Sequence, residues 1–115
     1  MQIRKTVTEV DKVLKPLHDV YGRWMNGGGG VSRDRDDLFD EAKDSLRDIR
    51  KDSPDETREY LRRIDDMVEQ LEEVLSIRNR QTSNALQKYQ ELTRAVSKVD
   101  EERKKLGVPL PNLNN

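Results

Sequence analysis

A seam of residues spaced alternately three and four apart runs through the second half of the chain and constrains its fold most strongly. Its members are Leu61, Ile64, Val68, Leu71, Leu75, Arg78, Thr82, Ala85, Tyr89, Leu92, Val96, Val99, Arg103 and Leu106. This spacing places one stripe on a single face of an α-helix, as in coiled coils. No glycine or proline occurs between Pro54 and Gly107. The pattern therefore predicts one continuous helix of about 53 residues, roughly 80 Å long.

Both ends of this helix carry boundary signals. Ser53 and Pro54 are typical of a helix start, and Glu56 is placed to complete a capping box with Ser53. Gly107 provides a stop, and Pro109 prevents the helix from resuming. An irregular tail is expected over residues 107–115.

A second seam with the same alternation occupies the start of the chain. It consists of Ile3, Val7, Val10, Leu14, Leu17, Tyr21 and Trp24. These residues predict a helix over residues 2–25. Pro16 lies inside it and removes one backbone hydrogen bond, which predicts either a kink near Leu14 or two helical pieces in one phase.

A shorter helix is expected between these two, from Ser32 or Asp34 to about Asp52. Its apolar stripe consists of Leu38, Phe39, Ala42, Leu46 and Ile49. The glycine-rich segment 27–33 forms a flexible connector, and it lacks the Gly-Lys-Ser/Thr ending of a phosphate-binding loop. We therefore expect one helical domain over residues 1–106.

The lengths of the three helices decide the expected fold class. The first two are about 36 and 27 Å long, so neither covers a stripe of about 80 Å. Leaving the rest in water forfeits roughly 1.5–3 kcal/mol for each large apolar side chain. Either the long helix breaks near residues 78–83 and folds back, or its second half meets another chain. We expect the second arrangement: an all-α, elongated bundle or coiled coil of three helices, the last one very long.

This arrangement divides the seam residues into two groups. The group that packs within the chain is Val7, Val10, Leu14, Leu17, Tyr21, Trp24, Leu61, Ile64, Val68 and Leu71. The group that meets a partner is Leu75, Arg78, Thr82, Ala85, Tyr89, Leu92, Val96, Val99 and Leu106. Arg78 and Thr82 interrupt the apolar stripe, and polar groups at such positions specify register and partner at a cost in stability. The alternative is that both are solvated where the bundle thins.

Composition agrees with thin helical architecture and excludes several classes of function. Charged residues make up 39% of the chain and hydrophobic residues 32%, which is too few for a thick core. The net charge of −1 argues against a domain that binds nucleic acid directly. The lack of cysteine suits a reducing, intracellular compartment. No apolar run approaches the ~20 residues needed to span a bilayer.

No group of side chains in the sequence indicates an active site. His18 is the only histidine, and there is no cysteine to share a metal ion with it. The acidic run over residues 34–45 departs from a calcium-binding loop at Leu38, Phe39 and Ser45. We expect no enzyme, no cofactor and no metal site.

Several positions follow the pattern of a known family. They are Met67, Leu71, Val74, Ile77, Ala85, Gln87, Tyr89, Leu92, Val96, Val99 and Asp100, together with the segment 7–11. This set resembles the N-terminal region of the inhibitor of growth family of chromatin proteins. Residues 27–52 have no counterpart there, Leu92-Thr93 replaces a Val-Asp pair, and the sequence has no cysteines to form the family's histone-reading finger.

The resemblance implies a nuclear scaffold segment of a histone acetyltransferase or deacetylase complex. Such a segment acts by coiled-coil pairing of helices, as a homodimer or with other subunits. The alternative is a three-helix bundle of membrane traffic, of the SNARE N-terminal or tethering-complex type, which binds a partner helix in a surface groove. The first function requires a continuous long helix, whereas the second requires a break near residues 78–83. The sequence leaves open the partner, the stoichiometry and the choice between parallel and antiparallel pairing.

Overall fold

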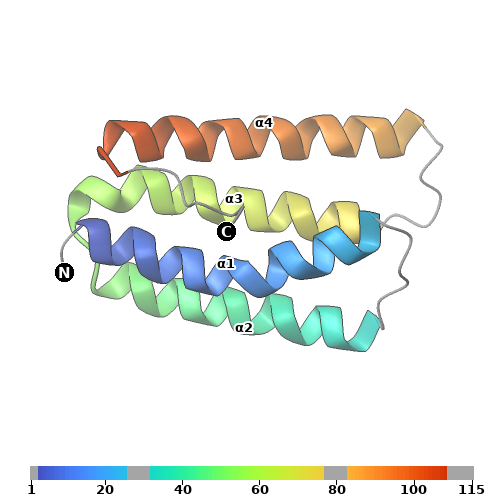
Figure 1. The fold of residues 1–115 in the computed structure, drawn as a ribbon, viewed down its shortest axis with the longest axis horizontal. Helices are drawn as coiled ribbons and strands as arrows, with labels where there is room; N and C mark the ends of the chain where they lie inside the picture. Colours follow the sequence, from blue (N-terminus) through green and yellow to red (C-terminus); the bar gives the residue numbers. More distant parts are fainter. Residues whose placement is uncertain (1–2, 26–31, 77–82, 109–115) are drawn as a thin grey trace.

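Four α-helices lie side by side along the long axis of the molecule (Figure 1). They are α1 (Ile3–Met25), α2 (Ser32–Lys51), α3 (Arg58–Leu75) and α4 (Ser83–Lys105), with a single-turn 3₁₀ helix, η1 (Asp55–Thr57), before α3. This computed structural model describes residues 3–25, 32–76 and 83–108. Successive helices run in opposite directions, and none of the described residues is in a β-strand.

The prediction of one very long last helix is wrong, because two helices occupy its place. α3 ends at Leu75 and α4 begins at Ser83, so the bundle has four helices instead of three. α4 folds back and packs along α3, which is its main neighbour. The principal extents are 42 × 27 × 25 Å, so the molecule is about half as long as the ~80 Å rod expected from the helical rise.

Burial gives the physical reason for the fold-back. Leu92 and Val99 of α4 are each 7% exposed and belong to the same apolar cluster as the buried residues of the other helices. A continuous helix forfeits this burial, worth roughly 1.5–3 kcal/mol for each such side chain. The backbone N–H of Ser76 donates to the carbonyls of Glu72 and Glu73 at 3.2 Å, and its hydroxyl donates to Glu72 at 2.9 Å. These bonds satisfy the end of α3 without a glycine or proline.

The core draws on all four helices. Of the residues expected to pack within the chain, the structure buries Val7, Val10, Leu14, Leu17, Trp24, Leu61, Ile64, Val68 and Leu71, and it partly buries Tyr21. The stripe of α2 adds Phe39, Ala42, Leu46 and Ile49. Tyr60 is the largest fully buried side chain and is 1% exposed. The core is therefore a thin layer along the bundle, as the low apolar content requires.

The start of α3 differs from the expected capping box. Ser53 does not cap this helix, because its hydroxyl donates to the Ile49 carbonyl and accepts a hydrogen bond of 3.1 Å from Thr6. The residue at the cap of η1 is Pro54, which has no side-chain donor or acceptor, and Thr57 donates to its carbonyl at 2.6 Å. Ser53 thus ties the end of α2 to α1.

The other end of the predicted helix is where the sequence places it. Gly107 has a φ of +74°, the left-handed conformation that costs glycine little. Its N–H donates to Lys104 at 3.0 Å, and the N–H of Val108 donates to Arg103 at 3.4 Å. These two bonds form a Schellman motif, which closes α4 and turns Val108 back against the core.

α1 continues through Pro16 as one helix. In Figure 1 it is bowed, with its middle turned away from α4 and its two ends closer to α4. Pro16 has no N–H to bond the carbonyl four residues earlier, and this weakens the helix where the bow occurs. The expected kink is thus a bow within a continuous helix. α2 begins at Ser32, so the end of the expected connector 27–33 is helical, and residues 26–31 lie outside the described part.

Candidate partner-binding groove

A groove runs between α1 and α4, and α3 forms its floor. No Cα atoms of α1 and α4 lie within 8 Å of each other over the lengths of these two helices that the structure describes. Figure 1 shows α3 in the space between them. The groove holds a cavity of about 80 Å³, lined by Leu14, Leu17, His18 and Tyr21 of α1, Met67 and Leu71 of α3, and Leu92 and Val96 of α4. We call this site the α1–α4 groove.

One end of the groove is closed by an ion pair. The Arg103 guanidinium donates to both carboxylate oxygens of Asp11, at 2.8 and 2.9 Å. The Arg103 side chain is 7% exposed, and the Asp11 side chain is 30% exposed. The hydrogen bond to Asp11 raises the pKa of Arg103 further above its ordinary value, so the arginine is always charged. This pair joins α1 to α4 although their backbones stay apart.

Aromatic rings close the other end. The rings of Trp24 and Tyr89 lie 6.0 Å apart between centroids, and those of Trp24 and Tyr21 lie 6.3 Å apart. Partial burial raises the pKa of Tyr21, and the nearby Tyr89 raises it further. The two closed ends are 13 residues apart on α1, which corresponds to roughly 20 Å of helix.

One of the exposed large apolar side chains of the described residues lines this groove, and two others lie one turn from the aromatic residues at its end. In the part of the chain that the structure describes, the exposed large hydrophobic residues are Met25, Leu86 and Val96, which are 50%, 58% and 39% exposed. Val96 lines the groove itself, and Leu86 lies one turn before Tyr89 on α4. Met25 lies one turn after Tyr21 on α1. Apolar surface gathered around one groove is typical of a binding site.

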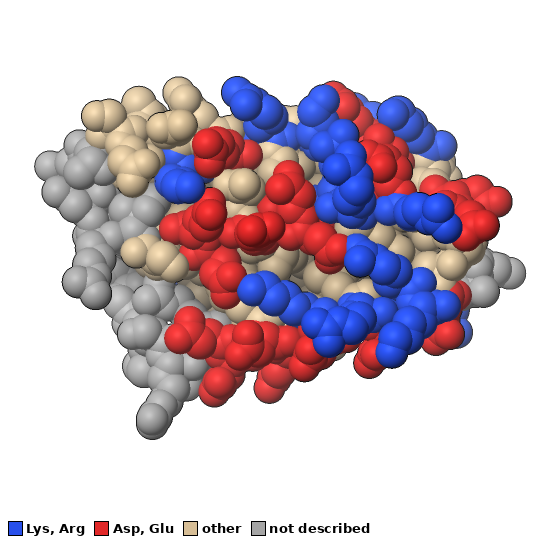
Figure 2. Space-filling view, turned by 180° about the vertical axis from the view of Figure 1, so that it is seen from behind, with Lys and Arg blue, Asp and Glu red and all other residues tan. Residues whose placement is uncertain are grey.

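The opposite face of the bundle is charged. Figure 2 shows this face covered by acidic and basic side chains. Lys43 and Glu72 form an ion pair of 2.8 Å between α2 and α3, and Lys88 and Glu73 form one of 2.9 Å between α3 and α4. Such exposed pairs contribute little to stability, so this face is best explained as solvated surface.

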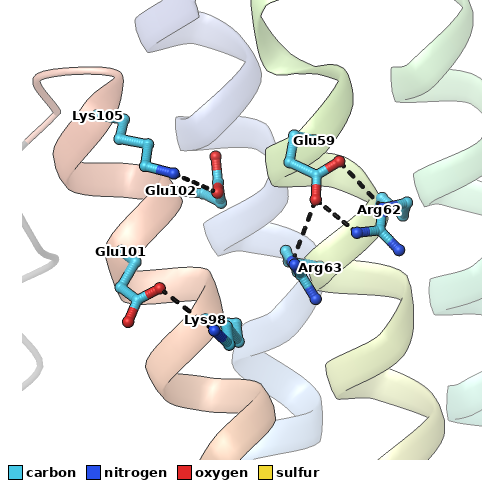
Figure 3. Close-up of polar contacts among 7 residues, drawn as sticks. All are labelled: Glu59, Arg62, Arg63, Lys98, Glu101, Glu102 and Lys105. Carbon is cyan, nitrogen blue, oxygen red and sulfur yellow. Dashed lines mark hydrogen bonds and ion pairs between the residues drawn. The ribbon is translucent and has the colours of Figure 1, made fainter.

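The charged side chains at the edge between α3 and α4 are also paired with one another (Figure 3). Glu59 accepts hydrogen bonds of 2.6 and 3.0 Å from Arg62 and lies 3.3 Å from Arg63. The hydrogen bond from Arg62 lowers the pKa of Glu59. On α4, Lys105 donates to Glu102 at 3.0 Å. The charges on this edge are paired with one another, which leaves no unbalanced site for a ligand.

A larger hollow of about 490 Å³ lies at the turn between α2 and α3. Its walls carry Arg50 and Asp65, which form an ion pair, and Arg58, which lies 3.4 Å from Asp55. These groups pair with each other, and polar or charged side chains make up most of the lining of the hollow. We therefore favour the smaller α1–α4 groove as the functional site.

The described residues contain no group of three or more histidine, cysteine, aspartate or glutamate side chains that could hold a metal ion. His18 stands alone and exposed at the wall of the groove. None of the helices that the structure describes is long and apolar enough to cross a membrane.

The residues expected to meet a partner are distributed differently from the prediction. Leu75, Ala85, Leu92 and Val99 are buried in the core, and Tyr89 and Leu106 are partly buried against it. Arg78 and Thr82 lie outside the described residues. Among the described members of the set, Val96 alone is both exposed and at the groove. The prediction that the chain leaves this apolar stripe uncovered is therefore wrong, because α4 turns most of the stripe inward against α3.

Sequence reasoning missed the α1 side of the site. His18, Gly22 and Met25 form a row beside the buried seam of α1, and their spacing of four and three was the available signal. Comparison of the chain with family models, with curated proteins and with solved structures finds no match.

Proposed function

We propose that this protein is a non-enzymatic interaction module that binds an amphipathic helix of a partner protein in the α1–α4 groove. One observation carries the proposal: the groove between α1 and α4 is lined almost entirely by apolar side chains, and one of them, Val96, is exposed there. A helix that lays its apolar face into such a groove is a common mode of recognition. It anchors through residues at positions i, i+3, i+4 and i+7.

This mode of action corresponds to the second expectation from the sequence, a compact bundle that takes up a partner helix. The first expectation, a chromatin scaffold, depended on a continuous rod, and α3 and α4 do not form one. The resemblance to the inhibitor of growth family and the nuclear location remain predictions. The positions that carry the resemblance include Ala85, which is buried, and Tyr89, which lies at the end of the groove.

Trp24 provides a direct test. It is the only tryptophan of the chain, and it lies at one end of the groove against Tyr89. The probe is a 14-residue peptide with leucines at a helical i, i+3, i+4, i+7 spacing and uncharged polar residues elsewhere. We expect a saturable change in Trp24 emission with this peptide. A peptide of the same composition in scrambled order should produce none.

Two variants locate the binding site. Val96→Asp places a charge inside the groove and should abolish the response to the patterned peptide. Arg94→Asp changes an exposed residue of the same helix outside the groove and should leave the response intact. Circular dichroism of both variants checks that the helices persist. Equal responses of Val96→Asp and the unmodified protein would reject the proposal.

A further inference from the structure

The chain turns back toward the core where α4 ends. α4 runs from the aromatic end of the α1–α4 groove, at Tyr89, to its ion-pair end, at Arg103. The Schellman motif at Gly107 then reverses the chain, and Val108 is partly buried against the core cluster. In Figure 1 the coloured end of the chain bends from α4 toward α3, which is the floor of the groove. The residues after Val108 therefore start at the ion-pair end of the groove.

The sequence of the segment 109–115, which lies outside the described residues, suits an extended strip with one apolar edge. It reads Pro-Leu-Pro-Asn-Leu-Asn-Asn and carries no charge, in a chain of which 39% of the residues are charged. Pro109 and Pro111 favour the polyproline II conformation, which has three residues per turn. Leu110 and Leu113 are three apart, so this conformation places both leucines on one side of the strip.

The reach of this segment matches the groove. The helical rise covers roughly 16 Å from Gly107 back to Val96. Polyproline II covers roughly 19 Å from Gly107 to Leu113, at about 3.1 Å per residue. Leu113 thus reaches the cavity beside Val96, and Leu110 reaches about half as far, to the ion pair of Arg103. Among the described residues that line the cavity, none is aspartate, glutamate, lysine or arginine, so an uncharged strip covers no unpaired charge.

From these observations we propose that the segment 109–115 occupies the α1–α4 groove of its own chain, with Leu113 against Val96 and Leu110 over the ion pair at the end of the groove. A partner helix must cover the same surface, so the segment competes with it and the protein is autoinhibited. This second part rests on the proposed function of the groove. A tethered segment competes at an effective concentration on the order of millimolar, which a free partner must overcome.

Trp24 reports the position of the segment in the full chain without any partner. Polyproline II covers roughly 25 Å from Gly107 to Asn115, and the helical rise covers roughly 27 Å from Gly107 to Tyr89, so the proposal places Asn115 near the aromatic end of the groove. The chain has one tryptophan and no cysteine, so Asn115→Cys accepts a single nitroxide quencher. We expect this label to quench most of the Trp24 emission. The same label at Lys51→Cys, at the opposite end of the bundle in Figure 1, should quench little.

Two double variants of equal charge show whether the leucines hold the segment in place. Leu110→Asp/Leu113→Asp in the labelled chain should restore the Trp24 emission, because a charged strip does not enter an apolar groove. Asn112→Asp/Asn114→Asp adds the same charge and keeps both leucines, so the quenching should persist. Equal quenching in the two variants, or none before substitution, would overturn the proposal. Quenching that is lost on dilution would place the segment in the groove of a second copy and overturn it as well.

The patterned 14-residue peptide then tests the competition on unlabelled protein. We expect Leu110→Asp/Leu113→Asp to bind this peptide at least about tenfold more tightly than the unmodified protein, because the tethered competitor is removed. Asn112→Asp/Asn114→Asp should bind it as the unmodified protein does. Equal affinity in all three proteins would refute the autoinhibition.

The two measurements separate this inference from the proposed function. If the leucine variant alone loses the quenching and no protein responds to the peptide, the segment occupies the groove and the proposed function fails. If the peptide binds, and Val96→Asp abolishes its binding, but the label on Asn115→Cys quenches nothing, the groove binds helices and the proposal for the segment is wrong.

Discussion

Arg103 is the one charged residue that is buried within the described part of the chain, and its position explains how α1 and α4 are held. Its guanidinium reaches Asp11, 92 positions away in the sequence. A buried ion pair adds little net stability, but loss of one partner leaves a charge without compensation. The pair therefore specifies the relative placement of two helices whose backbones do not touch.

Removal of Asp11 alone should lower the free energy of unfolding, whereas removal of both Asp11 and Arg103 should change it little. We expect Asp11→Ala to lower the free energy of unfolding by about 2 kcal/mol, less than the ~3–5 kcal/mol of a fully buried pair, because Asp11 is partly exposed. The double variant Asp11→Leu/Arg103→Met should regain most of this loss. Urea unfolding measures both variants. Lys51→Ala breaks an exposed pair with Asp48 and, as the control, should change stability by less than about 0.5 kcal/mol.

Tyr60 lies near this ion pair, and its hydroxyl is buried without a hydrogen-bond partner of good geometry among the described residues. Burial raises the pKa of Tyr60 well above its ordinary value of 10.0, and the negative charge of Asp11 raises it further. In the unfolded chain the phenol ionises near its ordinary pKa. Between the two pKa values the unfolded state holds fewer protons, so stability falls as the pH rises above about 10.

The substitution Tyr60→Phe removes this titration together with the unpaired hydroxyl. We expect little change in the urea midpoint at pH 7, because the contact of the hydroxyl with Arg103 is not a hydrogen bond of good geometry. Between about pH 9 and 11 the midpoint should fall less in Tyr60→Phe than in the unmodified protein, since the phenol no longer ionises on unfolding. An equal fall in both proteins would show that Tyr60 does not cause the alkaline loss.

At the scale of the helices, the sequence predicts most elements and misses one connection. The boundaries of α1, α2 and the end of α4 follow from seams, glycine and proline, all of which act locally. The break after Leu75 is not encoded by any such residue, and the seam keeps the same phase on both sides of it. The choice between a rod and a hairpin depends on whether the chain covers its own distal stripe, which is a tertiary effect that local patterns cannot decide.

The groove was less predictable than the core for the same reason. Seam spacing identifies Leu14, Leu17, Leu71 and Leu92 as inward-facing residues, but it does not reveal that α1 and α4 stay apart. That separation depends on the bow of α1 and on the way α4 folds back along α3. Gly22 and Pro16 are the local signals that accompany it, and each is ambiguous in the sequence alone.

Substitution by alanine should change the free energy of unfolding in opposite directions at two glycines, Gly22 inside α1 and Gly107 just after α4. Gly22 lies inside α1 with open space around it, so Gly22→Ala should raise the free energy of unfolding by about 0.5–1 kcal/mol. Gly107 has a φ of +74° in the Schellman motif, so Gly107→Ala should lower it by about 1–2 kcal/mol. Denaturant unfolding of both variants gives the two signs. Destabilisation by Gly22→Ala would indicate a contact of α1 that the described residues do not reveal.

At the scale of the whole molecule, the fold must form its core from few apolar residues. The radius of gyration is 14.5 Å, slightly larger than the ~13 Å of a compact domain of this length. The slightly larger radius of gyration agrees with an elongated bundle whose length is that of a single helix. Ion pairs join the helices across one face (Figure 2), and Val96 is exposed in the α1–α4 groove. We expect this separation to leave the α1–α4 groove as the surface that meets a partner.

A distance between the ends of the α3–α4 hairpin decides between this fold and a rod. Arg58 and Lys104 are exposed, and the chain has no cysteine, so Arg58→Cys/Lys104→Cys accepts two spin labels at defined places. A continuous helix separates these positions by about 70 Å. In the hairpin they belong to the same end of the bundle, where Lys105 is close enough to lower the pKa of Glu59.

Pulsed dipolar spectroscopy of the doubly labelled protein should therefore give one short distance, far below the value for a rod. Dilution with an excess of unlabelled protein, after partial unfolding and refolding of the mixture, identifies the chain that supplies α4. A short distance that persists at full amplitude means that α4 packs on its own α3. A short distance that fades means that α4 packs on a second copy, as in a domain-swapped dimer, and a long distance restores the rod. We expect the first result, because the described bundle buries Leu92 and Val99 against the chain's own core.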